Sequence, residues 1–454
     1  MALPKKLAKR LKSRMGATVV LDGAADRYVH AFDATANPNL PDAVVVPGTV
    51  EDLAWACEML WAAGVPTTPR GAGTGYAGGA VPARGGAVVV CDRLKGVEGG
   101  EDGVVAVEPG VVGDDLNRYL KNYGTFYPVD PASAEASTLG GHVATNAGGP
   151  RALKYGVTRD YVAAVEVLSP SRGRDLYGDE PAEPDVLSVL VGSEGTLAVF
   201  LRIWLRVLSA PEVTGAAVAT FDDAGTAAAV ASDVLRAGVL PAKLEFLDRR
   251  CIECVNAKEA GVLDEGAAAA LMFEFDGSGA AVADELAATA AIAGKAAVRR
   301  VETARDALAA ERLWRARRGI SPALGMLAPH KANEDVCVPL SQIPALLEFI
   351  GQLEEAYDVP VPTFGHIGDG NLHVNFMYDR RVDGQRRRVD EAVARLMARV
   401  VELGGTITGE HGVGTAKAPF LGLEQSTAEF AYARRVKSYF DAPGLLNPGK
   451  IFAD

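Results

Sequence analysis

The sequence lacks a run of apolar residues long enough to cross a membrane, and it has few cysteines. No stretch of about 18 apolar residues occurs among its 454 residues, so a transmembrane helix is not expected. Residues 1–16 lack the apolar core of a secretory signal. The five cysteines are scattered and odd in number, which indicates a reducing compartment and no disulfide framework. We therefore expect a cytoplasmic protein.

Positive charge is also scarce over the chain as a whole. The 46 Lys and Arg residues are outnumbered by 58 Asp and Glu residues, which gives a formal net charge of −12. Nucleic acid is not an expected partner, because a surface that binds it must offset phosphate charge. The first residues run against this trend, since they contain Lys5, Lys6, Lys9, Arg10, Lys12 and Arg14. We favour a solvated first helix there, and peripheral contact with the inner face of an anionic membrane or with an acidic partner is the alternative.

The cysteines do not suggest a metal cluster either. Cys251 and Cys254 form a single C-x-x-C pair, and two thiolates cannot complete a four-cysteine zinc or iron–sulfur site. We interpret them as neighbours one turn apart on a helix. The chain has no iron–sulfur or haem motif of its own.

A chain of this length predicts two or three domains. Short Val-rich segments alternate with helical and Gly-rich ones up to about residue 210, and Ala-rich helices with short strands follow. We predict a basic helical segment at 1–38, one domain at 39–210 and a second at 211–454, whose last part returns to the first domain. The expected strands are 42–47, 65–69, 87–91, 104–107, 162–169, 187–191, 196–208 and 270–275. The expected helices are 49–64 with Thr49 as its cap, 113–123, 224–237, 280–294 and 304–318.

Three Gly-rich loops predict the binding of a long anionic ligand. Residues 73–78 match G-x-G-x-x-G, but Pro82 and further glycines exclude the helix that a nicotinamide-binding loop must open. Residues 140–149 and 192–196 have the same character. Repeated glycines let backbone N–H groups close around an anion. Three such loops in one domain suggest a pyrophosphate with two end groups, and FAD is such a ligand.

Half of the chain's histidines fall in two Gly-rich motifs near the C-terminus. His366 and His373 flank Asp369-Gly370, a turn signal that can bring two imidazoles towards one point. Glu410, on a separate Gly-rich loop, could supply a third ligand. Two imidazoles and one carboxylate suit Zn²⁺, Mn²⁺ or Fe²⁺. The alternative is that these histidines are structural.

Six segments together resemble a known family. They are 69–75, 138–141 with 146–149, 191–196, 364–373, 409–414 and 446–450. They resemble the vanillyl-alcohol oxidase and p-cresol methylhydroxylase (PCMH) superfamily, in the branch that holds D-lactate dehydrogenase, D-2-hydroxyglutarate dehydrogenase and the flavin subunit of glycolate oxidase. The resemblance covers residues 40–452. It implies an α+β fold with a PCMH-type FAD-binding domain of two subdomains, and an FAD-linked oxidase C-terminal cap domain with an antiparallel sheet.

The resemblance also implies roles for particular residues. It makes His411 the catalytic base, and His366, His373 and Glu410 the metal ligands. Arg317 matches the arginine that holds the substrate carboxylate, with Arg315 and Arg318 as alternatives, and Asn375 approaches the substrate. The implied FAD contacts are Pro69, Arg70, Gly71, Ala72, Gly73, Thr74, Gly75, Thr138, Gly140, Gly141, Ala144, Thr145, Asn146, Gly148, Gly149, Glu194, Gly195, Thr196 and Asn447. Because residues 70–75 contain no histidine for a covalent link, we predict dissociable FAD.

The implied reaction is the oxidation of a small 2-hydroxy acid, such as D-lactate or glycolate, to the 2-keto acid by hydride transfer to flavin N5. The electrons would pass to an external acceptor: a quinone, a cytochrome, an electron-transfer flavoprotein, an iron–sulfur subunit or oxygen. A homodimer is compatible with the sequence. Two alternatives use the same scaffold: an FAD enzyme of the alkylglycerone-phosphate-synthase type, and a non-catalytic flavin-binding subunit of an oxidase complex.

Overall fold

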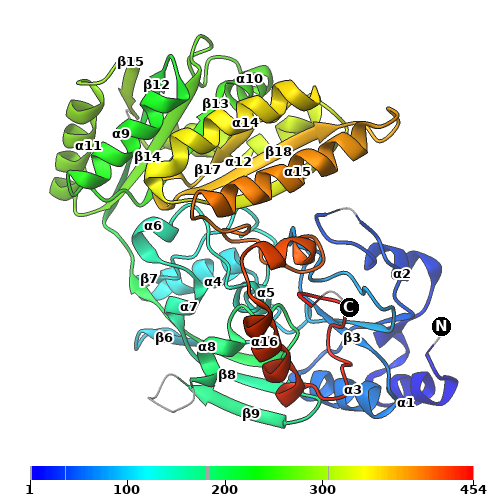
Figure 1. Cartoon of the computed structure of the whole chain (residues 1–454). Coiled ribbons are helices and arrows are strands. Elements are labelled where there is room, and N and C mark those ends of the chain that lie inside the picture. Colours follow the sequence, from blue (N-terminus) through cyan, green and yellow to red (C-terminus); the bar gives the residue numbers. More distant parts are fainter. Residues whose placement is uncertain (1–2, 36, 179–184, 305, 453–454) are drawn as a thin grey trace. The chain divides into compact units, whose positions relative to one another are not determined.

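The computed structural model describes residues 3–35, 37–178, 185–304 and 306–452 (Figure 1). The chain divides into two compact units. Unit 1 comprises Met1–Gly148, Val157–Ala210 and Glu410–Asp454, and unit 2 comprises Gly149–Gly156 and Pro211–Gly409. In the part of the chain that the structure describes, no helix is both long and apolar enough to span a bilayer.

The first sheet of unit 1 has the strand order β1-β2-β4-β3. Strands β2 (Ala43–Val45), β4 (Ala87–Val90) and β3 (Thr67–Arg70) are parallel, and β1 (Val20–Leu21) pairs antiparallel with β2. Helix α3 (Val50–Ala62) joins β2 to β3. Thr49 caps it as predicted, because its hydroxyl accepts the N–H of Asp52 at 3.1 Å. The Val-rich strands are buried on both faces, as strands of a parallel sheet usually are.

The second sheet of unit 1 is antiparallel, with the strand order β5-β6-β10-β8-β9. Its strands are β5 (Val97–Gly99), β6 (Val104–Val107), β8 (Val162–Ser169), β9 (Gly173–Gly178) and β10 (Val199–Arg206). From Leu201 onwards, buried residues of β10 (Leu201, Ile203 and Leu205) alternate with partly exposed ones (Arg202, Trp204 and Arg206), which confirms a half-exposed strand there. The strand predicted at 104–107 is confirmed.

The other elements of unit 1 are short apart from two helices. They are α1 (Lys5–Met15), α2 (Ala24–Val29), α4 (Gly113–Leu120), α5 (Leu139–Thr145), α7 (Thr158–Tyr161), α16 (Thr427–Phe440) and the strand pair β7 (Thr125–Phe126) and β11 (Leu208–Ser209). Helix α1 is amphipathic: Leu7 and Leu11 are buried in the core of unit 1, and the guanidinium of Arg14 lies 4.4 Å from the ring of Trp55.

One predicted strand of unit 1 is wrong. Residues 187–191 were expected to be extended because they are apolar and branched, but the structure has helix α8 (Val186–Leu190) there. The carboxylate of Asp185 accepts the N–H of Ser188 at 3.0 Å and caps the helix. Leu187 and Leu190, three residues apart, are the buried pair. A short apolar run fits either structure, and here the cap favours the helix.

Among its described residues, unit 2 is built on one seven-stranded antiparallel sheet with the order β15-β12-β14-β13-β17-β18-β16. The strands are β12 (Val213–Phe221), β13 (Lys243–Asp248), β14 (Ala269–Gly277), β15 (Val298–Thr303), β16 (His330–Cys337), β17 (Thr363–Gly365) and β18 (Asn371–Tyr378). All six pairings are antiparallel, as expected for the cap domain.

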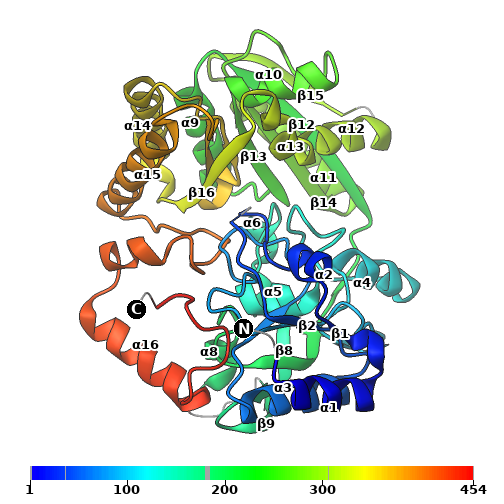
Figure 2. The same ribbon diagram turned by 90° about the vertical axis from the view of Figure 1, so that its right-hand side faces the viewer.

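Helices cover both faces of this sheet, as Figure 2 shows. One side carries α9 (Ala224–Arg236), α14 (Ile343–Tyr357) and α15 (Gln385–Glu402). Helix α11 (Gly279–Ala293) contacts α9 and packs against β12 and β14. The other side carries α10 (Arg249–Lys258), α12 (Ala307–Arg318) and α13 (Ile320–Ala323). Helix α6 (Ala152–Tyr155) also belongs to unit 2. Cys251 and Cys254 are both buried on α10, which confirms that they are helical neighbours.

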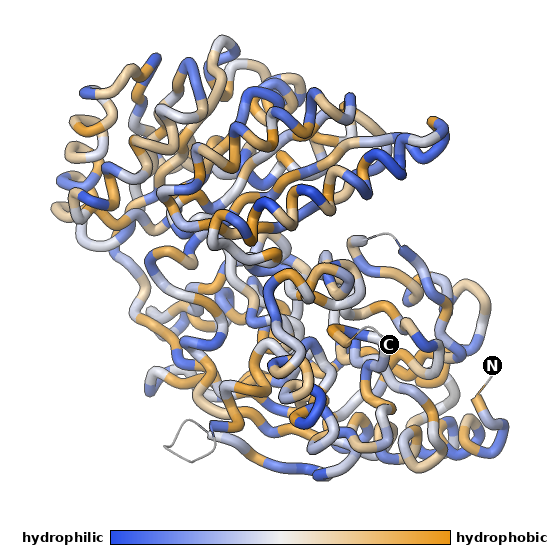
Figure 3. Tube along the Cα trace, viewed as in Figure 1, coloured by the Kyte–Doolittle hydropathy of each residue, from blue (hydrophilic) through white to orange (hydrophobic). Residues whose placement is uncertain are grey.

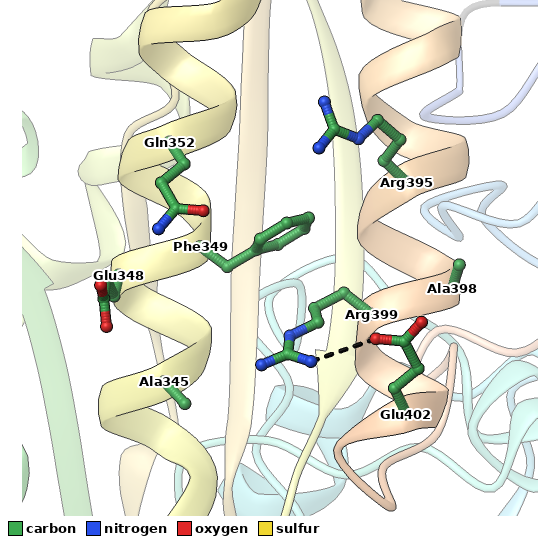
Figure 4. A pocket seen from close by; sticks show the side chains of 8 residues that line it. All are labelled: Ala345, Glu348, Phe349, Gln352, Arg395, Ala398, Arg399 and Glu402. Atoms are coloured by element: carbon green, nitrogen blue, oxygen red, sulfur yellow. Dashed lines mark hydrogen bonds and ion pairs between the residues drawn. The ribbon is translucent and has the colours of Figure 1, made fainter.

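The outer surface of α14 and α15 is polar and carries a groove. Figure 3 shows a largely hydrophilic segment, residues 379–388, which comprises the turn after β18 and the start of α15. The groove, of about 490 Å³, lies between the two helices, with Phe349 next to the guanidinium groups of Arg395 and Arg399 (Figure 4). Helices α10, α12 and α13 lie on the opposite side of the sheet from this groove (Figure 2).

Candidate active site

The loop that follows β3 in unit 1 presents a row of backbone N–H groups. Within the described residues, none of the amides of residues 71–75 donates a hydrogen bond to a protein acceptor. A Cβ built on Gly71 would lie 2.1 Å from the hydroxyl of Thr138, so only glycine allows the loop to approach the start of α5 this closely. Free amides in a glycine loop are what an anion such as a pyrophosphate requires.

The three predicted Gly-rich segments come together, although the second was expected to be a loop and its first part forms helix α5. The N–H groups of Gly192 and Glu194 donate to the carbonyls of Val143 and Ala144 at 2.9 and 2.6 Å, which joins the third loop to the second. A Cβ on Gly195 would lie 3.6 Å from the ring of Pro69, at the start of the first loop. Sequence spacing predicted the three loops separately, and the fold places them at one site.

The C-terminal motif completes this arrangement. The amide of Asn447 donates to the carbonyls of Glu194 at 2.8 Å and Gly79 at 3.0 Å. Within the described residues, the buried side-chain oxygens of Ser193 and Asn447 have no hydrogen-bond partner. Unpaired buried polar atoms beside a glycine loop are expected where a polar ligand binds. The residues present therefore fit FAD.

The two charged residues among the predicted FAD contacts, Arg70 and Glu194, have side chains that are engaged by protein atoms. The guanidinium of Arg70 donates to the carbonyls of Phe32 at 2.9 Å and Ala80 at 3.4 Å. Burial lowers the pKa of Arg70. The carboxylate of Glu194 accepts the N–H groups of Val413 and Gly414, each at 2.7 Å. These side chains brace the loops around them.

Glu194 holds the loop that carries Glu410 and His411. Burial raises the pKa of Glu194, although the two amide donors oppose this shift. The ring of His411 stacks on Tyr76, with 5.0 Å between ring centroids and 23° between ring planes. The predicted base thus lies in unit 1 with the predicted FAD-binding segments. Tyr76 stacks on its ring, and Glu194 holds the backbone of its loop.

His373 and Asn375, two more of the predicted residues, lie on one face of the sheet in unit 2. Side chains alternate along a strand, so His373 and Asn375 of β18 share a face. The register pairs His373 with Asp335 of β16 and with Phe364 of β17. Glu245 of β13 belongs to the same face, because Leu247, two residues on, pairs with Phe364. Helices α10, α12 and α13 cover the apolar part of this face.

The turn between β17 and β18 brings the two histidines together, as the Asp369-Gly370 signal predicted. Gly370 has a φ of +83°, and the rings of His366 and His373 lie 5.2 Å apart at 89°. Nδ1 of His366 lies 2.5 Å from Oε1 of Glu245. With Nδ1 engaged, Nε2 is the nitrogen of His366 that would ligate a metal ion.

His373 has a carboxylate neighbour as well. Its Nδ1 lies 3.8 Å from Oδ1 of Asp335, which is buried and also accepts the amide of Asn371 at 2.6 Å. The N–H of Gly409 donates to the carbonyl of Asp335 at 3.3 Å. A Cβ on Gly409 would lie 1.8 Å from the amide nitrogen of Asn371, so this position requires glycine. Gly409 is the last residue of unit 2, and Glu410, bonded to it, is the first of the following segment of unit 1.

Arg317 is the buried arginine among the three candidates. Its Nε donates to Oε2 of Glu245 at 2.6 Å, and its guanidinium lies 4.7 Å from the ring of Phe364. Arg315 and Arg318 make exposed ion pairs with Glu259 and Glu311. Burial would raise the pKa of Glu245, but Arg317 and His366 more than offset this, and the pKa lies well below its usual value.

Asn375 is fully buried within the sheet. Its amide donates to the carbonyls of Pro362 at 3.2 Å and His373 at 3.0 Å, and its oxygen accepts from Asn333 at 3.0 Å. Lys331 lies on the same face, two residues before Asn333, and burial lowers its pKa to about 8. The ammonium of Lys331 donates to the hydroxyl of Ser321.

Two known families match this chain, one towards its N-terminus and one towards its C-terminus. Residues 41–174 match the family described as FAD binding domain, and residues 210–451 match FAD linked oxidases, C-terminal domain. The second match spans more than half of the chain. The chain belongs to the FAD linked oxidases.

Relatives of this FAD linked oxidase cover nearly its whole length. It is 37% identical to glycolate oxidase subunit GlcD of Bacillus subtilis over 95% of this chain and 93% of that protein. It is 32% identical to the mitochondrial D-lactate dehydrogenase [cytochrome] of Arabidopsis thaliana, over 99% of this chain and 80% of that protein. Among solved structures, p-cresol methylhydroxylase with substrate bound has a TM-score of 0.81 at 14% identity, covering 99% of this chain and 97% of the other. This likeness confirms the PCMH-type fold.

Sequence reasoning did not find Glu245 and Asp335. Each lies within a strand, so its neighbours in sequence point to the other face of the sheet. Neither belongs to a glycine motif. The signal that could have found Glu245 is an acidic residue inside an otherwise apolar strand, Leu244 to Leu247. Only the register shows that these two carboxylates lie behind the two histidines.

Proposed function

We propose that this FAD linked oxidase converts a small 2-hydroxy acid, of the D-lactate or glycolate kind, to the 2-keto acid. The observation that carries this proposal is a buried set of four side chains: Glu245 and His373 on strands, His366 on the turn after β17, and Arg317 on α12. A guanidinium suits a substrate carboxylate, and two imidazoles backed by carboxylates suit a hydroxyl-binding metal site. The relatives named for glycolate and D-lactate support the same substrate class.

The residues of this chain would share the work as follows. Arg317 holds the substrate carboxylate, because its position is already fixed by Glu245 and Phe364. His411 takes the proton from the α-hydroxyl as general base, with its ring oriented by Tyr76. FAD bound by the glycine loops would supply the acceptor for the hydride from the α-carbon. Asn375 stays a prediction for the substrate contact.

A divalent metal ion is part of the proposal. His366 and His373 would be two of its ligands, and Glu410 the third. The donor set fits, because His366 offers one nitrogen while its other nitrogen contacts Glu245. Such an ion would polarise the substrate hydroxyl. Zinc or manganese suits this mixture of imidazole and carboxylate.

The remaining parts of the proposal concern FAD attachment and the electron acceptor. We propose non-covalent FAD, because residues 70–75 contain no histidine. The electrons would leave to an external quinone, cytochrome, electron-transfer flavoprotein or iron–sulfur subunit. Cys251 and Cys254, buried in a core, do not supply a cluster.

The test is anaerobic mixing of the FAD-loaded protein with a panel of D- and L-2-hydroxy acids, followed by the flavin absorbance. We expect rapid bleaching by at least one D-hydroxy acid or by glycolate, and turnover with an artificial dye acceptor. A flavin that no 2-hydroxy acid reduces would exclude this activity and favour a synthase of the alkylglycerone-phosphate type. His366→Ala, measured in parallel, should retain FAD because His366 belongs to unit 2 and the FAD-binding loops to unit 1.

A further inference from the structure

The carboxylate of Glu245 stands between two residues that the proposed function uses. It is fully buried on β13, and each of its oxygens has a different partner. Oε1 lies 2.5 Å from Nδ1 of His366, and Oε2 accepts from Nε of Arg317 at 2.6 Å. One side chain therefore fixes the positions of a histidine and an arginine that come from different parts of the sequence.

The geometry leaves little freedom to either partner. Nδ1 of His366 is engaged, so the ring can turn only by giving up a short contact to a buried carboxylate. Arg317 is clamped on one side by Glu245 and on the other by the ring of Phe364, at 4.7 Å. The side chain of Arg317 is 7% exposed, so water does not replace these partners.

We propose that Glu245 is a positioning residue that aims His366 at a metal ion and Arg317 at the substrate carboxylate. This proposal rests on the proposed function, since it deepens the roles given there to His366 and Arg317. Histidines that ligate metals usually donate their other N–H to a carboxylate or carbonyl, and loss of that partner weakens metal binding about 10- to 100-fold. Glu245 would serve as that carboxylate for His366. Its second oxygen would hold Arg317, which binds the substrate carboxylate.

A purely structural ion pair is the competing explanation, and unit 2 contains a matched control for it. Glu274 lies on β14, the neighbour of β13, and is also buried. Its carboxylate contacts Arg151 at 3.2 Å and Lys243 at 3.4 Å. Glu274→Gln therefore disturbs a comparable pair of cationic contacts in the same sheet without touching either histidine.

The experiment measures binding on FAD-loaded wild-type, Glu245→Gln and Glu274→Gln proteins. Metal affinity is read from competition of Zn²⁺ with a chromophoric chelator. Oxalate, a dianion shaped like the substrate that offers no hydride, is titrated against the flavin spectrum. We expect Glu245→Gln to lose about 10- to 100-fold in Zn²⁺ affinity. Oxalate binding should weaken as well, and Glu274→Gln should keep the wild-type affinities.

Wild-type affinity of Glu245→Gln for both Zn²⁺ and oxalate overturns the role of Glu245. Equal losses in Glu245→Gln and Glu274→Gln also overturn it, because they indicate a general effect on the sheet. If the wild type binds no Zn²⁺, the metal site of the proposed function is wrong. The role of Glu245 is then tested by oxalate alone, and unchanged oxalate affinity in Glu245→Gln overturns it. Glu245→Asp covers the case in which Glu245→Gln does not fold. It keeps the charge but is one carbon too short to reach both partners, so retention of both affinities contradicts the proposal.

Discussion

A buried ionic contact holds the short segment 149–156 to the sheet of unit 2. The carboxylate of Asp276 on β14 accepts from the ammonium of Lys154 at 2.5 Å and from the hydroxyl of Tyr155 at 2.9 Å. This segment begins at Gly149, the last residue of the predicted FAD segment 140–149. The change to make is Asp276→Ala, which removes the shared acceptor.

The structure sets the size of the expected effect. The side chain of Asp276 is 0% exposed and that of Lys154 is 23% exposed. Removal of one partner from a buried ion pair costs about 3–5 kcal/mol, because the other charge stays behind unpaired. Lys154 can reach water in part, so the lower end applies, and we expect a loss of about 3 kcal/mol in the free energy of unfolding of unit 2. The freed segment should also weaken FAD binding, since it anchors the end of an FAD loop.

The assay is equilibrium urea unfolding followed by circular dichroism, with flavin fluorescence recorded on the same samples. Asp284→Ala is the matched control, because Asp284 is an exposed aspartate on α11 of the same unit. A loss below about 1 kcal/mol in Asp276→Ala, the range of a surface ion pair, would refute the reasoning. So would an equal loss in the control.

Three further predictions concern the site and one buried carboxyl. His411→Ala should slow substrate-driven flavin reduction by about 10²- to 10⁴-fold while FAD still binds, and unchanged stopped-flow rates would remove the assignment of the base. Acid denaturation should release all the flavin into the supernatant, and colour that remains with the precipitate would show a covalent link. Burial raises the pKa of Asp248 to about 6, so its contribution to stability is present at low pH and is lost as pH rises from about 4 to about 6. The whole change amounts to about 3 kcal/mol, of which about 2 kcal/mol falls between pH 4.5 and 6.5. Asp248→Asn should flatten it in urea titrations at these two pH values.

Local patterns predicted most elements, and the error at 187–191 has a physical cause. Helix α3 begins where Thr49 caps it, and strand β10 alternates buried and partly exposed residues as its sequence does. Residues 187–191 carry no period that separates a strand from a helix, and the capping contact of Asp185 decided the outcome. The prediction of a strand considered only the branched apolar side chains and not the capping carboxylate of Asp185.

Those parts of the candidate site whose residues lie close together in the sequence could be predicted. His366 and His373 meet because a two-residue turn signal lies between them, and the geometry of such a turn is local. The partners of these histidines, Glu245 and Asp335, come from other strands. Their approach depends on strand register, which no neighbouring residue specifies.

By itself, the sequence determined the glycine loops, the histidine turn and the α+β class, because glycine torsions and side-chain periodicity act over a few residues. Tertiary structure alone decided that Glu194 grips the loop of His411 and that Glu245 joins Arg317 to His366. Those contacts link residues far apart in the chain, and they exist only once packing has removed water from the carboxylates and left protein donors as their partners.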